Sequence, residues 1–380
     1  MEHQFTVVIK GVLEHHFGEF AEDIYDKSQL IQYINEKTRS ANKGSKSRSS
    51  FANLYAIYVI IEDYINKEFN AKGDYSIYTG AEFSKLFTRQ RELPFGARLQ
   101  NHALNNRMNS EFQKFFPKSQ YTPILRNLET NKYWINENLL TVTVGKETFN
   151  ISVAVIEIIN EYVKTKQDSF QKFIKACEDL VQIEKSKPED VVAFIDSLLE
   201  PTVDARLFEI VSYSILKYHY HDQKIHWGYD LDQLQQENLK LYKTGRTNAN
   251  DGGIDFVMKP LGKFFQVTET LDFKKYFLDI DKIQKYPITF VIKSNEQVET
   301  IHKKISANAK RSYSIQAIVD KYMSCIEEII NIPALSSRFK DAVKENHLKA
   351  ILDEIILQSK VEFNYQDDDD EDENPEQSLF

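Results

Sequence analysis

The chain has 380 residues, of which 42% are hydrophobic and 12% aromatic, so it is long and apolar enough to fold into two or three domains. It contains no uninterrupted apolar run of about 18 residues, so we expect no membrane-spanning helix. The first residues, MEHQFTVVIKGVLEHHFGEF, place acids and histidines where a secretory signal needs a basic and then an apolar stretch. We therefore expect a cytoplasmic protein.

The formal net charge of −9 is concentrated at one end of the chain. The last twenty residues, VEFNYQDDDDEDENPEQSLF, contain nine acids and no lysine or arginine, so residues 1–360 have no net charge. We expect residues 361–380 to form a disordered, solvating tail. An alternative is a polyanion that competes with another anion for a basic groove.

A basic segment comes first in chain order. KTRSANKGSKSRSS, residues 37–50, has five basic residues and no acid, and it precedes a helical pattern of apolar residues at 54–65. Lysine and arginine side chains in such a segment suit contacts to phosphates. The candidates are Lys43, Lys46 and Arg48.

A second polar segment, TRQRELPFGARLQNHALNNR at residues 88–107, combines arginines with amides. Arginine can read guanine, and asparagine or glutamine can read adenine, through two hydrogen bonds each. We expect residues 1–120 to be a mainly helical DNA-recognition region, although this segment would also suit a solvated polar helix face. Its candidate DNA-binding residues are Arg89, Arg91, Arg98, Gln100, Asn101, Asn105, Asn106 and Arg107.

Residues 121–200 are predicted to be a connector. A hairpin is expected within 133–152, with its turn at 144–146, and helices are expected at 153–164, 168–183 and 188–199.

Residues 201–295 carry the pattern with the most chemistry. A helix over 203–219 is followed by a polar, largely helical connection that includes DLDQLQQENLKLY. The segment DGGIDFVMKPLGKFFQVTE at 251–269 predicts a hairpin, and PITFVIK at 287–293 predicts a further strand.

The hairpin is predicted to place Asp255 opposite Gln266, if its turn centres on Pro260 and Leu261. Because side chains alternate along a strand, Phe264, Gln266 and Thr268 share one face, while Phe265, Val267 and Glu269 share the other. A carboxylate facing a side-chain carbonyl can hold Mg²⁺ through oxygen ligands. Gly252 and Gly253 would let the backbone approach a sugar-phosphate chain.

The order of these pieces resembles the core of the PD-(D/E)xK nucleases, in a version with glutamine similar to the Mrr-type branch of restriction endonucleases. The resemblance covers about residues 203–293: a helix with Glu209, GGID ending in Asp255, and a strand with Gln266. It implies that Asp255 and Gln266 hold Mg²⁺ and that Glu209 is an accessory ligand.

The chain departs from this pattern at Thr268, where the family has a lysine that positions and polarises the attacking water. A threonine hydroxyl can orient a water but carries no positive charge. A base role for Glu269 or a second metal could compensate, or the site could be inactive. A lysine from a neighbouring element could also compensate, the candidates being Lys274, Lys275 and Lys293.

Other candidate ligands lack a recognised spacing. His219, His221 and His226 include a His-x-His pair but no third zinc ligand at a familiar distance in the sequence, and His15 and His16 are predicted to lie on the surface without a partner.

The sequence therefore predicts an α+β fold: the helical N-terminal region, an α/β nuclease core with a mixed central sheet at 201–295, and helices at 296–360. The expected activity is that of a type II restriction endonuclease, which cuts double-stranded DNA at specific sites with Mg²⁺. With that activity we expect the protein to form a homodimer. We also expect a DNA methyltransferase in the same system, which would not be a stable partner of this protein. The alternatives are a non-catalytic DNA-binding protein with a degenerate nuclease fold, and a helical interaction protein in which the hairpin is structural.

Overall fold

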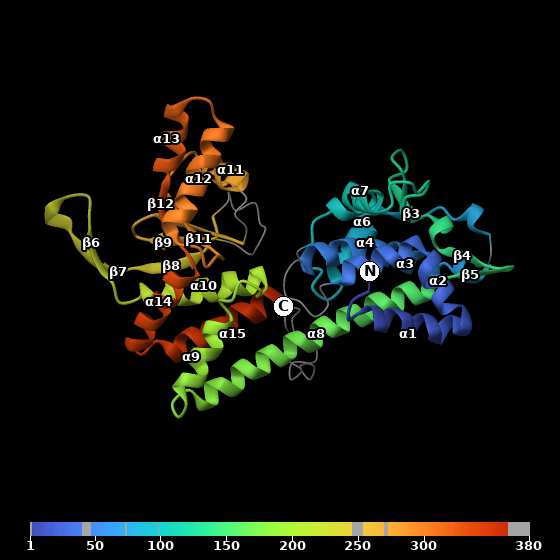
Figure 1. The fold of residues 1–380 in the computed structure, drawn as a ribbon, viewed down its shortest axis with the longest axis horizontal. Coiled ribbons are helices and arrows are strands. Elements are labelled where there is room, and N and C mark those ends of the chain that lie inside the picture. Colours follow the sequence, from blue (N-terminus) through green and yellow to red (C-terminus); the bar gives the residue numbers. More distant parts are fainter. Residues whose placement is uncertain are drawn as a thin grey trace, which may run out of the picture. The chain divides into compact units, whose positions relative to one another are not determined.

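The computed structural model describes residues 2–39, 47–72, 74–97, 99–244, 254–269 and 273–363. Over these residues the protein is a mixed α and β structure, as predicted (Figure 1). It divides into two compact units, Met1–Lys172 and Phe173–Phe380. The division falls inside the predicted connector, and the second unit joins the predicted core to the predicted C-terminal helices. Most of the predicted tail, residues 364–380, lies outside the described residues.

The first unit is mainly helical. Its helices are α1 (Thr6–Phe17), α2 (Ala21–Lys27), α3 (Gln29–Thr38), α4 (Ser47–Asn66), α5 (Phe69–Lys72), α6 (Phe83–Glu92) and α7 (Met108–Phe115), with a π-helical turn at Ala103–Arg107. Its strands form a sheet in the order β1 (Ala81–Glu82), β3 (Lys132–Ile135), β2 (Ile124–Asn127), and a hairpin of β4 (Thr141–Val144) and β5 (Glu147–Asn150). The hairpin turn lies where it was predicted.

Helix α4 is the centre of this unit, and it includes the helix predicted at 54–65. Residues 51–60 are all buried, so this part of the helix is surrounded by protein on every side. This explains why apolar residues occur on all of its faces.

Helix α8 (Ser152–Ile183) replaces two predicted helices with one of 32 residues. No glycine or proline interrupts the segment between the two predicted helices, and Thr165 bonds back to the Glu161 carbonyl oxygen at 2.8 Å. Lysine and glutamine at the junction are good helix formers, so the helix continues.

The second unit is built on a five-stranded mixed sheet in the order β12-β11-β10-β9-β8. The strands are β8 (Lys240–Lys243), β9 (Phe256–Lys259), β10 (Lys263–Thr268), β11 (Ile288–Ile292) and β12 (Ile326–Ile330). The β8-β9 and β9-β10 pairs are antiparallel, whereas the β10-β11 and β11-β12 pairs are parallel. The helices are α9 (Pro188–Ser197), α10 (Ala205–His219), α11 (Phe273–Lys282), α12 (Val298–Ser312), α13 (Gln316–Ser324), α14 (Ile332–Lys344) and α15 (Leu348–Phe363).

Both faces of this sheet are covered by helices (Figure 1). Phe256, Phe265 and Val291 pack in one core with residues of α10, α14 and α15, while Ile288 and Phe290 pack in another with residues of α11, α12 and α13. Every residue of β11 is buried, as expected for a central strand in parallel pairing on both sides.

Two predictions for this unit were wrong. The connection around 230–242 contains strands: β6 (Lys224–Trp227) pairs with β7 (Gln235–Asn238), and β8 follows. Buried Leu239 and Leu241 alternate with exposed Lys240 and Tyr242, which is the period of a strand. Residues 296–360 are not purely helical either, because β12 pairs with β11 and is held there by contacts distant in sequence.

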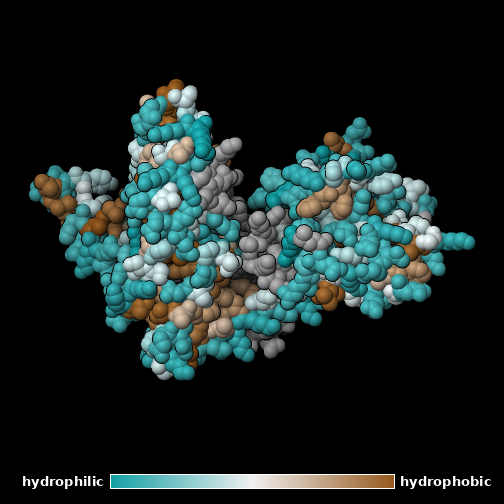
Figure 2. Space-filling model, viewed as in Figure 1, coloured by the Kyte–Doolittle hydropathy of each residue, from teal (hydrophilic) through white to brown (hydrophobic). Residues whose placement is uncertain are grey.

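The β6-β7 hairpin carries exposed apolar side chains, visible as hydrophobic surface at its tip (Figures 1 and 2). Tyr229 is 97% exposed and Leu231 82% exposed. None of the helices among the described residues is both long and apolar enough to cross a membrane.

Glu328 on β12 joins two other elements of the second unit. Its carboxylate lies 3.1 Å from the ammonium of Lys263 on β10, and it also bonds to Arg338 on α14. Burial acts to raise the pKa of Glu328, but Arg338 and Lys263 outweigh burial and hold this pKa below its ordinary value of 4.5.

This arrangement predicts a loss of stability in acid. A folded-state pKa below the unfolded value means that the contribution of Glu328 to the free energy of unfolding is present above about pH 4.5 and is lost as the pH falls through the folded-state pKa. We expect Glu328→Gln to lower the unfolding free energy at pH 7 and to make it fall less between pH 5 and pH 3 than in the wild type. Urea denaturation at several pH values measures both, and equal pH slopes would contradict the prediction.

Candidate functional site

The sequence-predicted site residues of the second unit meet at one edge of the five-stranded sheet. Strand β8 ends at this edge and β9 begins there, because the two strands are antiparallel, and β10 and β11 both end there. Helix α10 also begins at this edge, since the carbonyl oxygen of Val203, two residues before the helix, accepts a hydrogen bond from Lys293 just after β11.

Asp255 lies beside Gln266, as the hairpin register predicts. The pairs Met258-Lys263 and Phe256-Phe265 lead toward an Asp255-Gln266 pair at the next position. The backbone N–H of Asp255 donates to the Phe265 carbonyl oxygen at 2.9 Å, and the Asp255 carboxylate accepts from the Val267 N–H at 2.6 Å. Asp255 is thus bonded to both neighbours of Gln266 and is held in place by β10.

Gln266 is 7% exposed, and its side-chain oxygen Oε1 is buried without a hydrogen-bond partner among the described residues. Its Nε2 donates to the Val267 carbonyl oxygen at 3.3 Å. An amide carbonyl oxygen buried without a donor or a cation costs about 1–3 kcal/mol, so a buried one in a folded protein calls for an explanation.

The predicted alternation of faces along β10 is confirmed. Phe264 packs in the core with α11 and α12, and Phe265 and Val267 pack in the core with α10. Thr268, like Gln266, is buried. Its carbonyl oxygen accepts from the Lys293 backbone N–H at 3.0 Å, so the chain at Lys293 lies directly beside the position where the family has its lysine.

Lys293 forms an ion pair with Glu269. The distance from the Lys293 ammonium to the Glu269 carboxylate is 3.2 Å, and the lysine side chain is 1% exposed against 35% for the glutamate. Of the three lysines considered as substitutes for the missing one, Lys293 is therefore at the sheet edge. Lys275 is exposed on α11, and the side chain of Lys274 lies outside the described residues.

Glu209 lies on α10 near the same edge, but α10 covers the face of the sheet that Phe265 and Val267 occupy, opposite to the face of Gln266. The Glu209 carboxylate is 3.1 Å from the ammonium of Lys243, the last residue of β8, and both side chains are largely buried. Lys243 is paired with Phe256, and the N–H of Thr244 donates to the Asp255 carbonyl oxygen at 3.1 Å. Lys243 was missed by sequence reasoning, and the strand pattern of residues 239–242 is the signal that could have placed it here.

The predicted DNA-binding residues are dispersed in the first unit. Arg89 on α6 forms two hydrogen bonds of 2.8 Å with the Glu62 carboxylate, which raise the pKa of Arg89. Arg91 donates to the Ala97 carbonyl oxygen at 2.9 Å, and Arg107 lies 3.1 Å from Glu111. These arginines are engaged within the unit.

The amides follow the end of α6 at Glu92 and do not lie on one helix. Gln100 and Asn106 are exposed, while Asn101 is half-buried in a turn. Lys43, Lys46 and Arg98 lie outside the described residues, as do the side chains of Arg48 and Asn105 and the residues Gly252 and Gly253.

The structure shows the neighbours of two groups of histidines. The prediction that His15 and His16 lack a partner was wrong, because His16 bonds to Glu157, which is 141 residues away and carries no local signal. His221 lies beside His347, with ring centroids 5.6 Å apart, and His347 bonds to Asp222 at 2.7 Å.

Comparison with protein-family models, with curated proteins and with solved structures found no match for this chain.

Proposed function

We propose that this protein is a Mg²⁺-dependent DNA endonuclease whose active site is the sheet edge around Asp255 and Gln266. The observation that supports the proposal most strongly is the buried Gln266 Oε1, which has no hydrogen-bond partner among the described residues and belongs to the strand residue that neighbours Asp255. A neutral carbonyl oxygen and a carboxylate are the donors that Mg²⁺ accepts together with water and phosphate oxygens. The residues present therefore fit this ion.

Asp255 and Gln266 would hold the ion. Glu209 would act as the accessory carboxylate around the ends of the strands, because α10 lies on the opposite face of the sheet from Gln266. When bound, Mg²⁺ supplies a Lewis acid for the scissile phosphate and lowers the pKa of a bound water. The protein orients the ligands: the Val267 N–H fixes the Asp255 carboxylate, and Lys243 fixes Glu209. The Thr268 hydroxyl would orient a water, but it carries no positive charge that could stabilise the hydroxide formed from it.

The positive charge missing at Thr268 would come from Lys293. Its backbone is bonded to Thr268, and its ammonium is buried at the same edge on the face of Glu269, so it would have to reach the ion around the end of β10. In this role Glu269 would hold Lys293 in position and would not itself act as the base.

We further propose that the target is double-stranded DNA cut at specific sites, as in type II restriction. Exposed Gln100 and Asn106 are suited to reading bases. Cutting both strands of a site favours a homodimer with twofold symmetry. A cognate methyltransferase would protect the host DNA without being a stable partner.

One assay tests the proposal. Purified protein is incubated with mixed plasmid and phage DNA, with Mg²⁺ in one series and EDTA in the other. Discrete fragments that appear only with Mg²⁺ support the endonuclease. Salt-sensitive DNA binding without cutting would instead indicate the degenerate, non-catalytic module, which the threonine at 268 favours. If the protein neither cuts nor binds DNA, the endonuclease and the non-catalytic DNA-binding module are both excluded, and an interaction protein remains.

Gln266→Met is expected to change stability and activity in opposite directions. Methionine has a similar volume and removes the unpartnered carbonyl, so the free energy of unfolding should rise by about 1–3 kcal/mol. The rate of Mg²⁺-dependent cleavage should fall by at least about tenfold, because a ligand is lost. Urea denaturation and the cleavage assay measure the two effects.

Gln90 provides a matched control, because its Oε1 is also buried without a partner among the described residues, on α6 in the first unit. Gln90→Met should leave the cleavage rate unchanged. A stable Gln266→Met variant with wild-type cleavage would exclude Gln266 as a ligand.

A further inference from the structure

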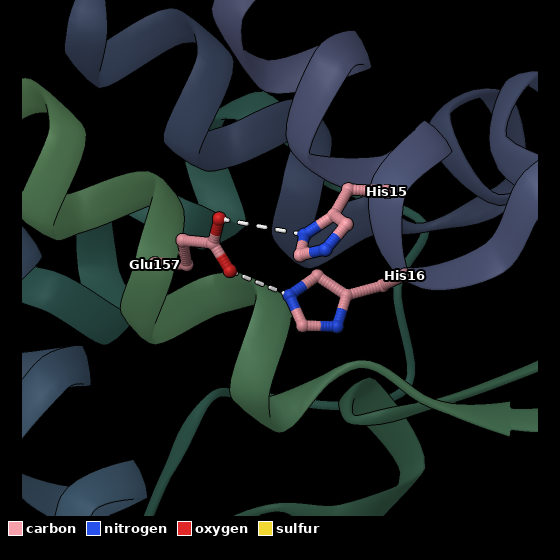
Figure 3. Close-up of side chains that lie close together, drawn as sticks. All are labelled: His15, His16 and Glu157. Carbon is pink, nitrogen blue, oxygen red and sulfur yellow. Dashed lines mark hydrogen bonds and ion pairs between the residues drawn. The ribbon is translucent and has the colours of Figure 1, made fainter.

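Two adjacent histidines and a glutamate converge on the surface of the first unit (Figure 3). His15 and His16 lie in the last turn of α1, and Glu157 lies in the second turn of α8. Figure 3 shows both imidazole rings turned toward the two oxygens of the same carboxylate.

The distances place three ligand atoms in one small volume. His16 Nε2 is 2.6 Å from Glu157 Oε2, and His15 Nδ1 is 3.9 Å from Glu157 Oε1. One ligand atom from each residue lies within 4.8 Å of the others. Zinc takes nitrogen and oxygen ligands at about 2.0–2.2 Å, so two ligands of one tetrahedral ion are about 3.4 Å apart. The two printed His-Glu157 distances, 2.6 and 3.9 Å, lie on either side of that spacing.

The surroundings favour a cation at this place. Both histidines stand at the C-terminal end of α1, where the helix dipole is negative and the last carbonyl groups point outward. Two imidazoles and one carboxylate are the ligand set of zinc sites that keep their fourth position open. The His16 side chain is 23% exposed and the His15 side chain 74% exposed, so an ion can enter from solvent.

We propose that His15, His16 and Glu157 bind one Zn²⁺ ion, with water in the fourth position. The ion would join α1 to α8 across 141 residues of sequence, in place of the single His16-Glu157 hydrogen bond. This site is independent of the Mg²⁺ site proposed for the second unit. By binding only the folded arrangement of α1 and α8, the ion would stabilise the first unit.

The test uses the full chain without an affinity tag, stripped with EDTA and then freed of it. An Asp222→Asn/Asp255→Asn background removes the other histidine-carboxylate group among the described residues, Asp222, Glu345 and His347, and the carboxylate of the proposed Mg²⁺ site. Titration calorimetry with ZnCl₂ gives affinity and stoichiometry, and Co²⁺ in place of Zn²⁺ gives visible bands whose intensity reports four-coordination. Thermal unfolding with and without Zn²⁺ gives a third readout.

We expect one equivalent of Zn²⁺ to bind and to raise the unfolding temperature. Glu157→Gln and His16→Asn should each weaken binding more than about 100-fold, since loss of even an outer-shell partner costs 10–100-fold. Both should abolish the thermal effect. His302→Asn, at an exposed position on α12, should bind as the parent does.

No zinc binding in the parent, or unchanged binding in a His16→Asn/Glu157→Gln double variant, would overturn the proposal. These outcomes do not depend on DNA cleavage, so the zinc proposal and the nuclease proposal can be rejected independently of each other. Circular dichroism of each variant shows that a lost affinity comes from a lost ligand and not from unfolding.

Discussion

Replacing Asp255 with alanine is expected to lower the rate of Mg²⁺-dependent DNA cleavage by about a thousandfold. A metal ion stabilises the charge of the transition state by several kcal/mol, and each 1.36 kcal/mol is a factor of about ten in rate. In the proposed site Asp255 is a charged ligand, and the Val267 N–H of β10 holds its carboxylate in place. Its loss should therefore remove most of that stabilisation. Cleavage of plasmid DNA under single-turnover conditions measures the effect.

A second substitution separates charge from structure. Asp255→Asn keeps an acceptor for the Val267 N–H but removes the negative charge, so it should fold like the wild type and still lose most of the activity. Asp341→Ala serves as a control, since Asp341 is an exposed carboxylate on α14 that pairs with Lys344 at 3.1 Å. Full activity in folded Asp255→Asn would show that Asp255 holds no metal.

Replacing Glu269 with alanine is expected to lower the free energy of unfolding by about 3–5 kcal/mol, the range for a buried charge left without its partner. The Lys293 side chain is 1% exposed, so its ammonium would remain buried with only the Val203 carbonyl oxygen. Lys293→Met should lower the free energy of unfolding by less, because the Glu269 carboxylate that loses its partner is 35% exposed and can be hydrated. Urea denaturation of both variants measures the asymmetry.

The double variant makes this prediction sharper. Glu269→Ala/Lys293→Met should be more stable than Glu269→Ala alone, because the uncompensated buried charge is gone. If Lys293 supplies the charge missing at Thr268, Lys293→Met should also slow cleavage, while Lys344→Met on the surface should not. A Glu269→Ala variant as stable as the wild type would contradict the burial argument.

The hairpin that carries the site could be predicted from sequence because its determinants are local. Pro260 and Gly262 place the turn, and alternating apolar residues set which side chains share a face. Together these fixed the neighbouring positions of Asp255 and Gln266. Helix α10 and strand β11 were also predictable from their own periodicity.

Features set by distant contacts were not predictable. Strand β12 becomes part of the sheet through its pairing with β11, and the boundary between the units falls inside a continuous helix. From the sequence, Lys293 was one of three lysines that could replace the one missing at position 268. The parallel pairing of β10 and β11, a contact between distant segments, places it beside Thr268. The His16-Glu157 contact joins residues 141 positions apart.

Thr268 therefore does not by itself imply an inactive site. The sequence lacks a lysine at the expected position, but the fold brings a buried lysine to the adjacent strand end. This is the basis for proposing an active enzyme in preference to a degenerate module. The buried Gln266 oxygen, which has no hydrogen-bond partner within the described ranges, supports the same preference because a cation would satisfy it.

The claim that Asp255 and Gln266 hold a divalent cation is tested most directly by titrating Mn²⁺, a paramagnetic substitute for Mg²⁺, and following free Mn²⁺ by electron paramagnetic resonance. A Glu157→Gln/Asp222→Asn background keeps both histidine-carboxylate groups from contributing. We expect one bound Mn²⁺ that Mg²⁺ displaces, and we expect Gln266→Met to weaken its binding at least about tenfold. Equal Mn²⁺ binding with and without Gln266→Met, or no binding in the parent, would contradict the claim.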